Sequence, residues 1–106
     1  MDNSFSNRVK NLIKGIPYGM VATYGQIATS AGNPRAARQV SWILHSSSRK
    51  YNLPWHRVIN SQGYISLPRF EGYELQKQLL IDEGVEFDEN DLIDLKKYQY
   101  RHLKQD

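Results

Sequence analysis

The chain has 106 residues with a formal net charge of +3, and 40% of its residues are hydrophobic and 24% charged. This is the composition of one globular domain with a single modest core. No window approaches the roughly 18 consecutive apolar residues of a membrane span, so no membrane association is predicted. The first ten residues, MDNSFSNRVK, lack an apolar signal core, and we expect a cytoplasmic or nucleoid-associated protein (nuclear in a eukaryote).

Cysteine is absent, which excludes disulfides, thiolate metal sites and a cysteine nucleophile. The three histidines, His45, His56 and His102, do not pair at i,i+4 and no HExxH occurs, so no metal site is predicted. No GxGxxG or Walker pattern occurs either, and no cofactor is expected.

The charge is distributed unevenly along the chain. Residues 1–60 contain eight Lys and Arg and a single acid, Asp2, whereas residues 61–106 contain six Lys and Arg and ten acids. A basic half of this kind indicates a face that binds a polyanion. A solvated basic surface explains the charge alone about equally well.

Two helices are predicted in the first thirty residues. Residues 3–14 carry apolar side chains at helical spacing, and Pro17 follows their end. Thr23 and Gln26 form a Thr-x-x-Gln capping box, in which each side chain satisfies a backbone amide of the other residue. This box predicts a short helix over residues 24–30.

A third helix is predicted directly afterwards. Asn33-Pro34 is typical of an N-cap followed by the first helical position, and the helix should run to about Ser46. Two helices joined by a short turn that contains glycine form a helix-turn-helix, although any helical hairpin can give this pattern.

Beyond residue 46 the pattern is less regular. Residues 57–59 and 64–66 predict a small β-hairpin. A further helix is predicted over residues 72–83, with three leucines as its buried face: Leu75, Leu79 and Leu80. We expect one domain over residues 1–85 and a tail, residues 86–106, that packs on it or extends from it, with a solvated acidic face between Asp82 and Asp94.

The third predicted helix has two unlike faces. Its core arc holds Ala36, Ala37, Val40, Ile43 and Leu44, and its opposite arc holds Arg35, Arg38, Trp42 and His45. A tryptophan on the charged side is unusual, because large apolar surface normally seeks burial. One interpretation is a cation–π pair between Arg38 and Trp42. We favour a face that contacts nucleic acid, because the helix is second in a helix-turn-helix.

Three stretches carry a family resemblance: YGQIA at residues 24–28, GNPRAARQV at 32–40 and PWHRVI at 54–59. Over roughly residues 4–85 the chain resembles the C-terminal domain of O6-alkylguanine-DNA alkyltransferases. The resemblance implies a mainly α fold with a small β-hairpin, forming a single helix-turn-helix (winged-helix-like) DNA-binding domain.

One position departs from the family's pattern. The family's motif is Pro-Cys-His-Arg-Val, whose cysteine accepts the alkyl group, and here that position is Trp55. The sequence is similar to the alkyltransferase-like proteins, which recognise alkylated guanine without repairing it. Alkyl transfer needs a soft, anionic nucleophile, and the indole nitrogen is a donor without an available lone pair. The chain is therefore predicted not to be an enzyme.

The resemblance also implies DNA contacts. Tyr24 matches the tyrosine that presses on the target phosphate during flipping, and its alternative role is that of a core tyrosine. Arg38 matches the arginine finger that replaces the extruded base, and its alternative is a surface salt bridge. The remaining predicted DNA contacts are Arg35, Ala36, Trp42 and Ser47.

A lesion pocket is implied as well, with Tyr24, Pro54, Trp55 and Arg69 as its members. Trp55 would supply an apolar wall, since aromatic–base stacking is worth about 1–3 kcal/mol, or it would be a core tryptophan. Arg69 would stack on the flipped guanine and sense its electronic state, or it would be a surface arginine near acids.

Four further residues match the family's relay to the reactive cysteine or its motif. They are His56, Arg57, Asn60 and Glu83. Because no thiol is present for this relay to deprotonate, we expect these residues to support the pocket loop.

The expected function is non-enzymatic recognition of O6-alkylguanine in double-stranded DNA. The resemblance implies that the protein binds from the minor groove, flips the guanine out of the stack and bends the DNA toward the major groove. The bound protein would then mark the lesion for nucleotide excision repair. UvrA-type proteins would be partners, and the protein would act as a monomer, because no dimer face is evident.

The first alternative is a helix-turn-helix DNA-binding protein that reads unmodified sequence. The second is a hydrolase using Ser46–Ser48, His56 and Glu83, although no GxSxG elbow exists.

Overall fold

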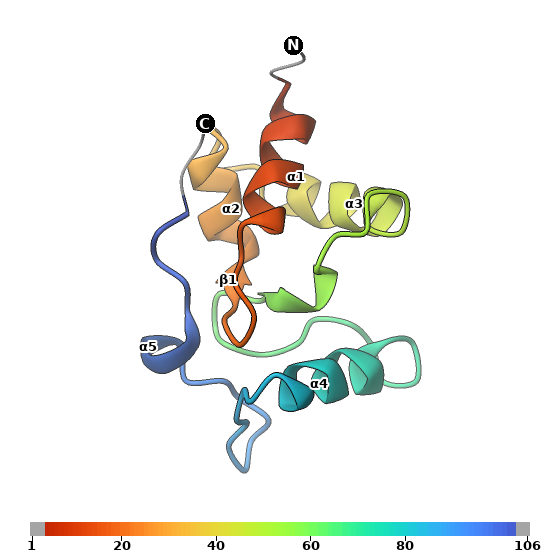
Figure 1. Ribbon diagram of the computed structural model, residues 1–106, viewed down its shortest axis with the longest axis vertical. Coiled ribbons are helices and arrows are strands. Elements are labelled where there is room, and N and C mark those ends of the chain that lie inside the picture. Colours follow the sequence, from red (N-terminus) through yellow and green to blue (C-terminus); the bar gives the residue numbers. More distant parts are fainter. Residues whose placement is uncertain (1–3, 104–106) are drawn as a thin grey trace.

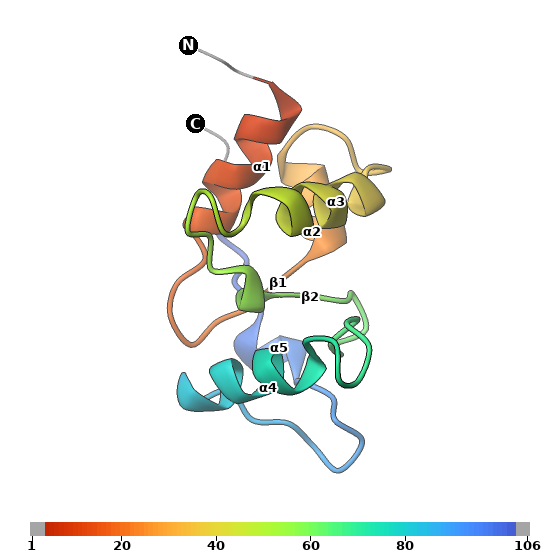
Figure 2. The ribbon, with the colours of Figure 1, turned by 90° about the vertical axis from the view of Figure 1, so that its right-hand side faces the viewer.

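The computed structural model describes residues 4–103, which form a molecule about 43 Å long and 27 by 23 Å across. Three helices occupy one end, a two-stranded sheet crosses the middle, and two helices occupy the other end (Figure 2). In chain order the elements are α1 (Phe5–Lys14), β1 (Ala22–Thr23), α2 (Tyr24–Ser30), α3 (Ala37–Ser47), the 3₁₀ helix η1 (Trp55–Arg57), β2 (Val58–Ile59), α4 (Tyr73–Asp82) and α5 (Leu95–Tyr98).

The helical lobe of α1, α2 and α3 follows the sequence closely. α1 begins at an N-cap, Ser4, whose side chain accepts from the amide of Asn7, and it buries Val9, Leu12 and Ile13. At the start of α2 both hydrogen bonds of the predicted capping box are present. α2 and α3 pack together, so the helix-turn-helix is confirmed.

The start of α3 is a correction. The helix begins at Ala37, with Ala36 as an N-cap that makes no side-chain cap bond, and not at Asn33-Pro34. Asn33 instead closes a turn, because its Oδ1 accepts from the Arg35 amide at 3.2 Å and its carbonyl accepts from the Ala36 amide at 3.1 Å. The asparagine side chain thus serves a local turn, which competes with helix capping.

The predicted β-hairpin is wrong. β2 pairs in parallel with β1, with Ala22 opposite Val58 and Thr23 opposite Ile59. Residues 60–63 do form a turn, in which the amide of Asn60 donates to the Tyr64 carbonyl at 3.0 Å, but residues 64–66 are not a strand. Val58 and Ile59 are both fully buried. A continuous apolar pair of this kind is typical of a strand covered on both faces, as parallel strands are.

α4 is present, but its buried face differs from the prediction. Gln76 and Leu80 are buried, whereas Leu75 is 57% exposed and Leu79 is half-buried. Gly72 precedes the helix with φ +117°, where a Cβ would lie 2.9 Å from Leu67 Cδ1. The positive φ favours a glycine there, and a larger residue would also push the end of the Leu67 side chain aside.

Residues 85–103 cover the far side of the sheet (Figure 1). Val85, Ile93 and Tyr98 join a second core cluster with Val21, Ile59 and Leu80. Among the acids of this region, Asp91 accepts from Lys77 Nζ at 2.8 Å and from the Tyr73 hydroxyl at 2.9 Å. Among residues 4–103, no helix has the length and apolar character that crossing a membrane requires.

Candidate nucleic-acid interface

An open cleft of about 700 Å³ lies between α3 and the segment leading into α4. This volume falls within the range of about 300–1,000 Å³ that is usual for sites that enclose a small ligand. Four predicted site residues line it, namely Tyr24, Arg38, Trp42 and Trp55. Residues that sequence reasoning did not assign to it also take part: Ser41, Leu44, His45, Ser48, Arg49, Leu67, Glu71, Gly72 and Gln76.

The outer face of α3 agrees with the predicted helical wheel. Val40, Ile43 and Leu44 are buried, while Arg38 is exposed and Trp42 is 72% exposed. The cation–π pairs recorded within residues 4–103 do not include Arg38 with Trp42. A large exposed indole next to an arginine without an acidic partner in this part of the chain is typical of a binding surface.

Tyr24 and Trp55 reach the cleft from the two ends of the sheet segment. Tyr24 follows β1 as the first residue of α2, and Trp55 opens η1 just before β2. Burial raises the pKa of the Tyr24 phenol further above its ordinary value of about 10, and the side chain is a neutral hydrogen-bond donor at physiological pH. Both rings are half-buried against the helical core, so each shows one side to the cleft.

A charged network lies behind the Trp55 turn. Glu83 accepts from His56 Nε2 at 2.6 Å, from Arg57 Nη2 at 2.9 Å and from the Gly19 amide at 2.8 Å. Arg57 Nη1 also donates to the carbonyl of Ile16 at 2.9 Å. The network ties η1 to the end of α4 and to the turn after α1.

The electrostatics of Glu83 follow from these contacts. Burial alone would raise the pKa of this carboxyl, but the hydrogen bonds from Arg57, the Gly19 amide and His56 outweigh it and lower the pKa to about 2. The carboxylate is therefore charged at neutral pH and holds the His56-Arg57 turn in place.

Gln76 is a residue that sequence reasoning missed. Its side chain is buried, and its Nε2 donates to the carbonyl of His56 at 3.1 Å and to that of Val58 at 2.9 Å. Gln76 thus fixes both ends of the segment that follows Trp55, from beneath the cleft floor. A glutamine between two leucine-rich turns of a predicted helix is the one signal that could have drawn attention to it.

Several predicted site residues lie elsewhere. Pro54 lines a smaller cavity on the other side of Trp55, and Ala36 is buried in the helical core. Asn60 serves its own turn by accepting from the Gln62 amide, and it does not join the Glu83 network. Arg69 is 69% exposed and lies 3.6 Å from Asp91 and over the Tyr73 ring.

Arg35 and Ser47 do not line the cleft either. Arg35 is exposed in the turn before α3, and Ser47 is the last residue of that helix.

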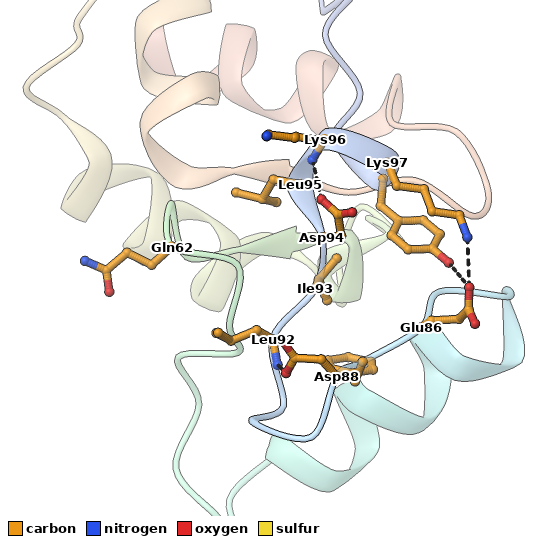
Figure 3. Close-up of a pocket in the computed structure, with 11 residues that line it drawn as sticks. Gln62, Glu86, Asp88, Leu92, Ile93, Asp94, Leu95, Lys96 and Lys97 are labelled. Carbon is orange, nitrogen blue, oxygen red and sulfur yellow. Dashed lines mark hydrogen bonds and ion pairs between the residues drawn. The ribbon is translucent and has the colours of Figure 1, made fainter.

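A second cavity, of about 710 Å³, lies at the far end of the molecule between the segment 86–98 and Gln62 (Figure 3). Glu86 there accepts from Lys97 Nζ and from the Tyr98 hydroxyl, both at 2.9 Å. None of the predicted site residues lines it. Within residues 4–103 no group of three or more His, Asp or Glu side chains is placed to hold a metal ion.

A helix-turn-helix whose second helix presents arginine and tryptophan beside an aromatic cleft defines a DNA-binding domain with a pocket for a single small group. Residues 4–85 match the family described as "6-O-methylguanine DNA methyltransferase, DNA binding domain". The chain belongs to this family, and the resemblance inferred from its motifs is confirmed.

Two similar curated relatives are not methyltransferases by name. The chain is 43% identical over 101 residues to the "DNA base-flipping protein" of Escherichia coli K12, covering 95% of this chain and 78% of that protein. It is 38% identical over 104 residues to "Alkyltransferase-like protein 1" of Schizosaccharomyces pombe, covering 93% and 96%.

Solved structures agree with this placement. Atl1 of S. pombe in complex with damaged DNA containing O6-carboxymethylguanine has a TM-score of 0.79 and 37% identity, covering 94% of this chain and 97% of that one. The O6-methylguanine methyltransferase of Mycobacterium tuberculosis has a TM-score of 0.63 and 32% identity, covering 78% and 50%.

Proposed function

We propose that the protein binds O6-alkylguanine in double-stranded DNA, turns the modified nucleotide out of the stack and holds it in the cleft without removing the alkyl group. One observation carries the proposal. Trp55 forms a wall of the cleft at the position of the family's acceptor cysteine, in a chain that contains no cysteine.

Arg38 and Tyr24 have the placement that extrusion requires. Arg38 is exposed on the outer face of α3 at the cleft rim, and its planar guanidinium can stack and hydrogen-bond in the space a base leaves. Tyr24 lines the cleft from the start of α2 and carries a neutral hydroxyl, which suits a contact with a phosphate oxygen. Extrusion costs a few kcal/mol, which these contacts partly offset.

The cleft wall suits an alkylated base. Trp55, Leu67 and Leu44 supply apolar surface, and no thiol is present to react with the O6 substituent. The open shape of the cleft leaves room for substituents of different size. Docking through the minor groove, with DNA bent toward the major groove, fits the close, shape-led approach of a helix that begins at the small residue Ala37.

Arg69 does not line the cleft, so its proposed contact with the extruded guanine requires its side chain to move. Its ion pair with Asp91 is long and exposed, and an exposed ion pair is worth about 0–1 kcal/mol. Arg69 can therefore leave Asp91 at little cost and stack on the extruded guanine, whose potential changes when O6-alkylation removes the N1 proton.

Because the lesion stays in place, the bent complex would serve as a signal. We propose hand-over to nucleotide excision repair through UvrA-type proteins, and competition with true alkyltransferases for the same sites. The protein would bind as a monomer. The cavity beside Glu86 lies at the opposite end from α3 and stays open to a partner when DNA is bound.

The test compares two short duplexes at one stated salt concentration, one with O6-methylguanine and one with guanine. Tighter binding to the modified duplex is expected, and mass spectrometry of DNA and protein afterwards should show the methyl group still on the DNA. Equal binding would instead favour a helix-turn-helix DNA-binding protein without lesion specificity. A methylated protein would contradict the non-enzymatic function.

A further inference from the structure

The side chain of Gln26 does more than cap α2. Its Oε1 accepts from the Thr23 amide at 3.1 Å and from Gln99 Nε2 at 2.9 Å, and its Nε2 donates to the carbonyl of Tyr100. Every polar atom of the amide therefore has a partner. The reversed amide orientation would set Nε2 against the Thr23 donor and Oε1 against the Tyr100 acceptor, so a single orientation satisfies the set.

The backbone of the C-terminal segment strengthens this connection. The Val21 amide donates to the Tyr98 carbonyl at 2.9 Å, and the Tyr100 amide donates to the Val21 carbonyl at 2.7 Å. These bonds form a parallel bridge between Val21 and Gln99. Figure 1 shows the chain after α5 running beside β1 and α2.

Residues 21–26 are consequently held on two sides. β2 pairs with β1 on one edge, and residues 98–100 bind the other edge and the capping box. Tyr24 lies within this clamped stretch, between the capping residues Thr23 and Gln26. Any displacement of residues 98–100 would change the restraint on the stretch that carries Tyr24 at the cleft.

Residues 98–100 lie outside the part of the chain that matches the methyltransferase family, which is residues 4–85. The alignment with the E. coli base-flipping protein covers 95% of the chain and so extends through residues 98–100, whereas the methyltransferase of M. tuberculosis covers 78%. The segment is therefore shared with a relative named for base flipping, beyond the shared DNA-binding domain.

We propose that residues 98–100 are a positioning element for Tyr24, with Gln99 as the positioning residue that acts through Gln26. The inference rests on the proposed function, because its effect is on the extruded state of the DNA. Docking onto unmodified duplex uses the outer face of α3 and does not require a fixed Tyr24.

Two variants separate this role from folding. Gln99→Ala removes one donor to Gln26. Gln26→Glu keeps an ordinary capping-box residue but replaces the donor to the Tyr100 carbonyl with a repelling carboxylate. The matched control is Gln78→Ala, which removes a glutamine bond to Asp82 on the exposed side of α4.

Three quantities are measured: the affinity for each duplex, the thermal midpoint of the protein, and the emission of a fluorescent cytosine analogue. The analogue is placed opposite the O6-methylguanine and brightens when that base leaves the stack. Gln99→Ala should lower affinity for the modified duplex about three- to tenfold and dim the analogue, with unmodified-duplex affinity unchanged. Gln26→Glu should dim the analogue at saturating protein, and Gln78→Ala should match the wild type.

The outcomes are distinct. Equal losses of affinity for both duplexes would overturn the positioning role and leave the proposed function intact. Wild-type emission from the analogue with both Gln99→Ala and Gln26→Glu at saturating protein would do the same. A wild-type protein that shows no preference for the modified duplex and no emission change would overturn the proposed function and the positioning role together.

Discussion

At the scale of single residues, Trp55 combines two properties that a cysteine at this position could not. It packs against the helical core and also lines the cleft, together with Arg38 and Gln76. The substitution that removes a nucleophile thus adds a stacking surface, which changes a site for reaction into a site for retention.

Trp55→Ala should therefore weaken binding to the O6-methylguanine duplex about 10- to 100-fold, as expected for the loss of one aromatic–base stack worth about 1–3 kcal/mol. Affinity for the unmodified duplex should change little. Fluorescence anisotropy of labelled duplexes measures both values. Tyr64→Ala, which truncates an aromatic ring that is 40% exposed and outside the cleft, is the control. Equal weakening on both duplexes would place Trp55 in general DNA binding.

Glu83 gives a prediction about pH. Its pKa is about 2 in the folded protein, below the ordinary 4.5, so its charged form stabilises the fold. This contribution is complete above about pH 4.5 and is lost as the pH falls toward 2; it amounts to at most about 3 kcal/mol. Chemical denaturation should show wild type more stable than Glu83→Gln at pH 6, with the gap narrowing below pH 4.5. Exposed Glu89→Gln should show no such gap, and a gap that persists at pH 2 would contradict the assignment.

At the scale of elements, one local capping signal predicted its helix correctly, whereas a second local signal and the strand pairing were misread. The capping box at Thr23 predicted the start of α2 correctly, because both of its partners lie within four residues. Asn33 looked like a cap, but its side chain closes a turn instead. The partner of β2 is β1, some 35 residues earlier, and no pattern within residues 57–66 carries that information.

The residues of the cleft also divide into those that the sequence predicts and those that it does not. Tyr24, Arg38 and Trp55 were predicted from motifs and Trp42 from the helical wheel, and the structure brings all four to one cleft. Gln76 was missed, because its role depends on carbonyl groups that lie about 20 residues away in sequence and face α4 only after folding.

Gln76→Ala tests the element that supports the cleft. The substitution leaves the carbonyls of His56 and Val58 without this buried donor, which should destabilise the protein by about 1–3 kcal/mol. For a domain of this size the thermal midpoint should fall by about 4–8 °C for each kcal/mol. In a Trp42→Phe background Trp55 is the single tryptophan, so its emission reports whether η1 has loosened. Gln78→Ala on the exposed side of α4 should change stability by less than about 0.5 kcal/mol, and equal effects of the two would contradict the role of Gln76.

At the scale of the whole molecule, the charge asymmetry maps onto the architecture. The basic residues 4–60 build α1, α2, α3 and the Trp55 turn (Figure 2). Residues 61–98, which carry most of the acids of the second half, build α4, α5 and the far end, and residues 99–103 run back beside α2. A polyanion is therefore attracted to one end and repelled from the other, which orients the α3 face toward DNA before any specific contact forms.

Salt dependence separates this general attraction from lesion recognition. Each phosphate contact contributes about 0.9 to the slope of log affinity against log salt concentration on duplex DNA. Arg35→Ala, in the exposed turn before α3, should lower the slope by about this amount on modified and unmodified duplexes alike, and so leave the preference for O6-methylguanine unchanged. Lys96→Ala removes an equal charge at the acidic end and should leave the slope unaltered, because α5 lies away from the α3 face. If Lys96→Ala lowered the slope as much as Arg35→Ala, the acidic end would also contact DNA, and the orientation derived from the charge pattern would be wrong.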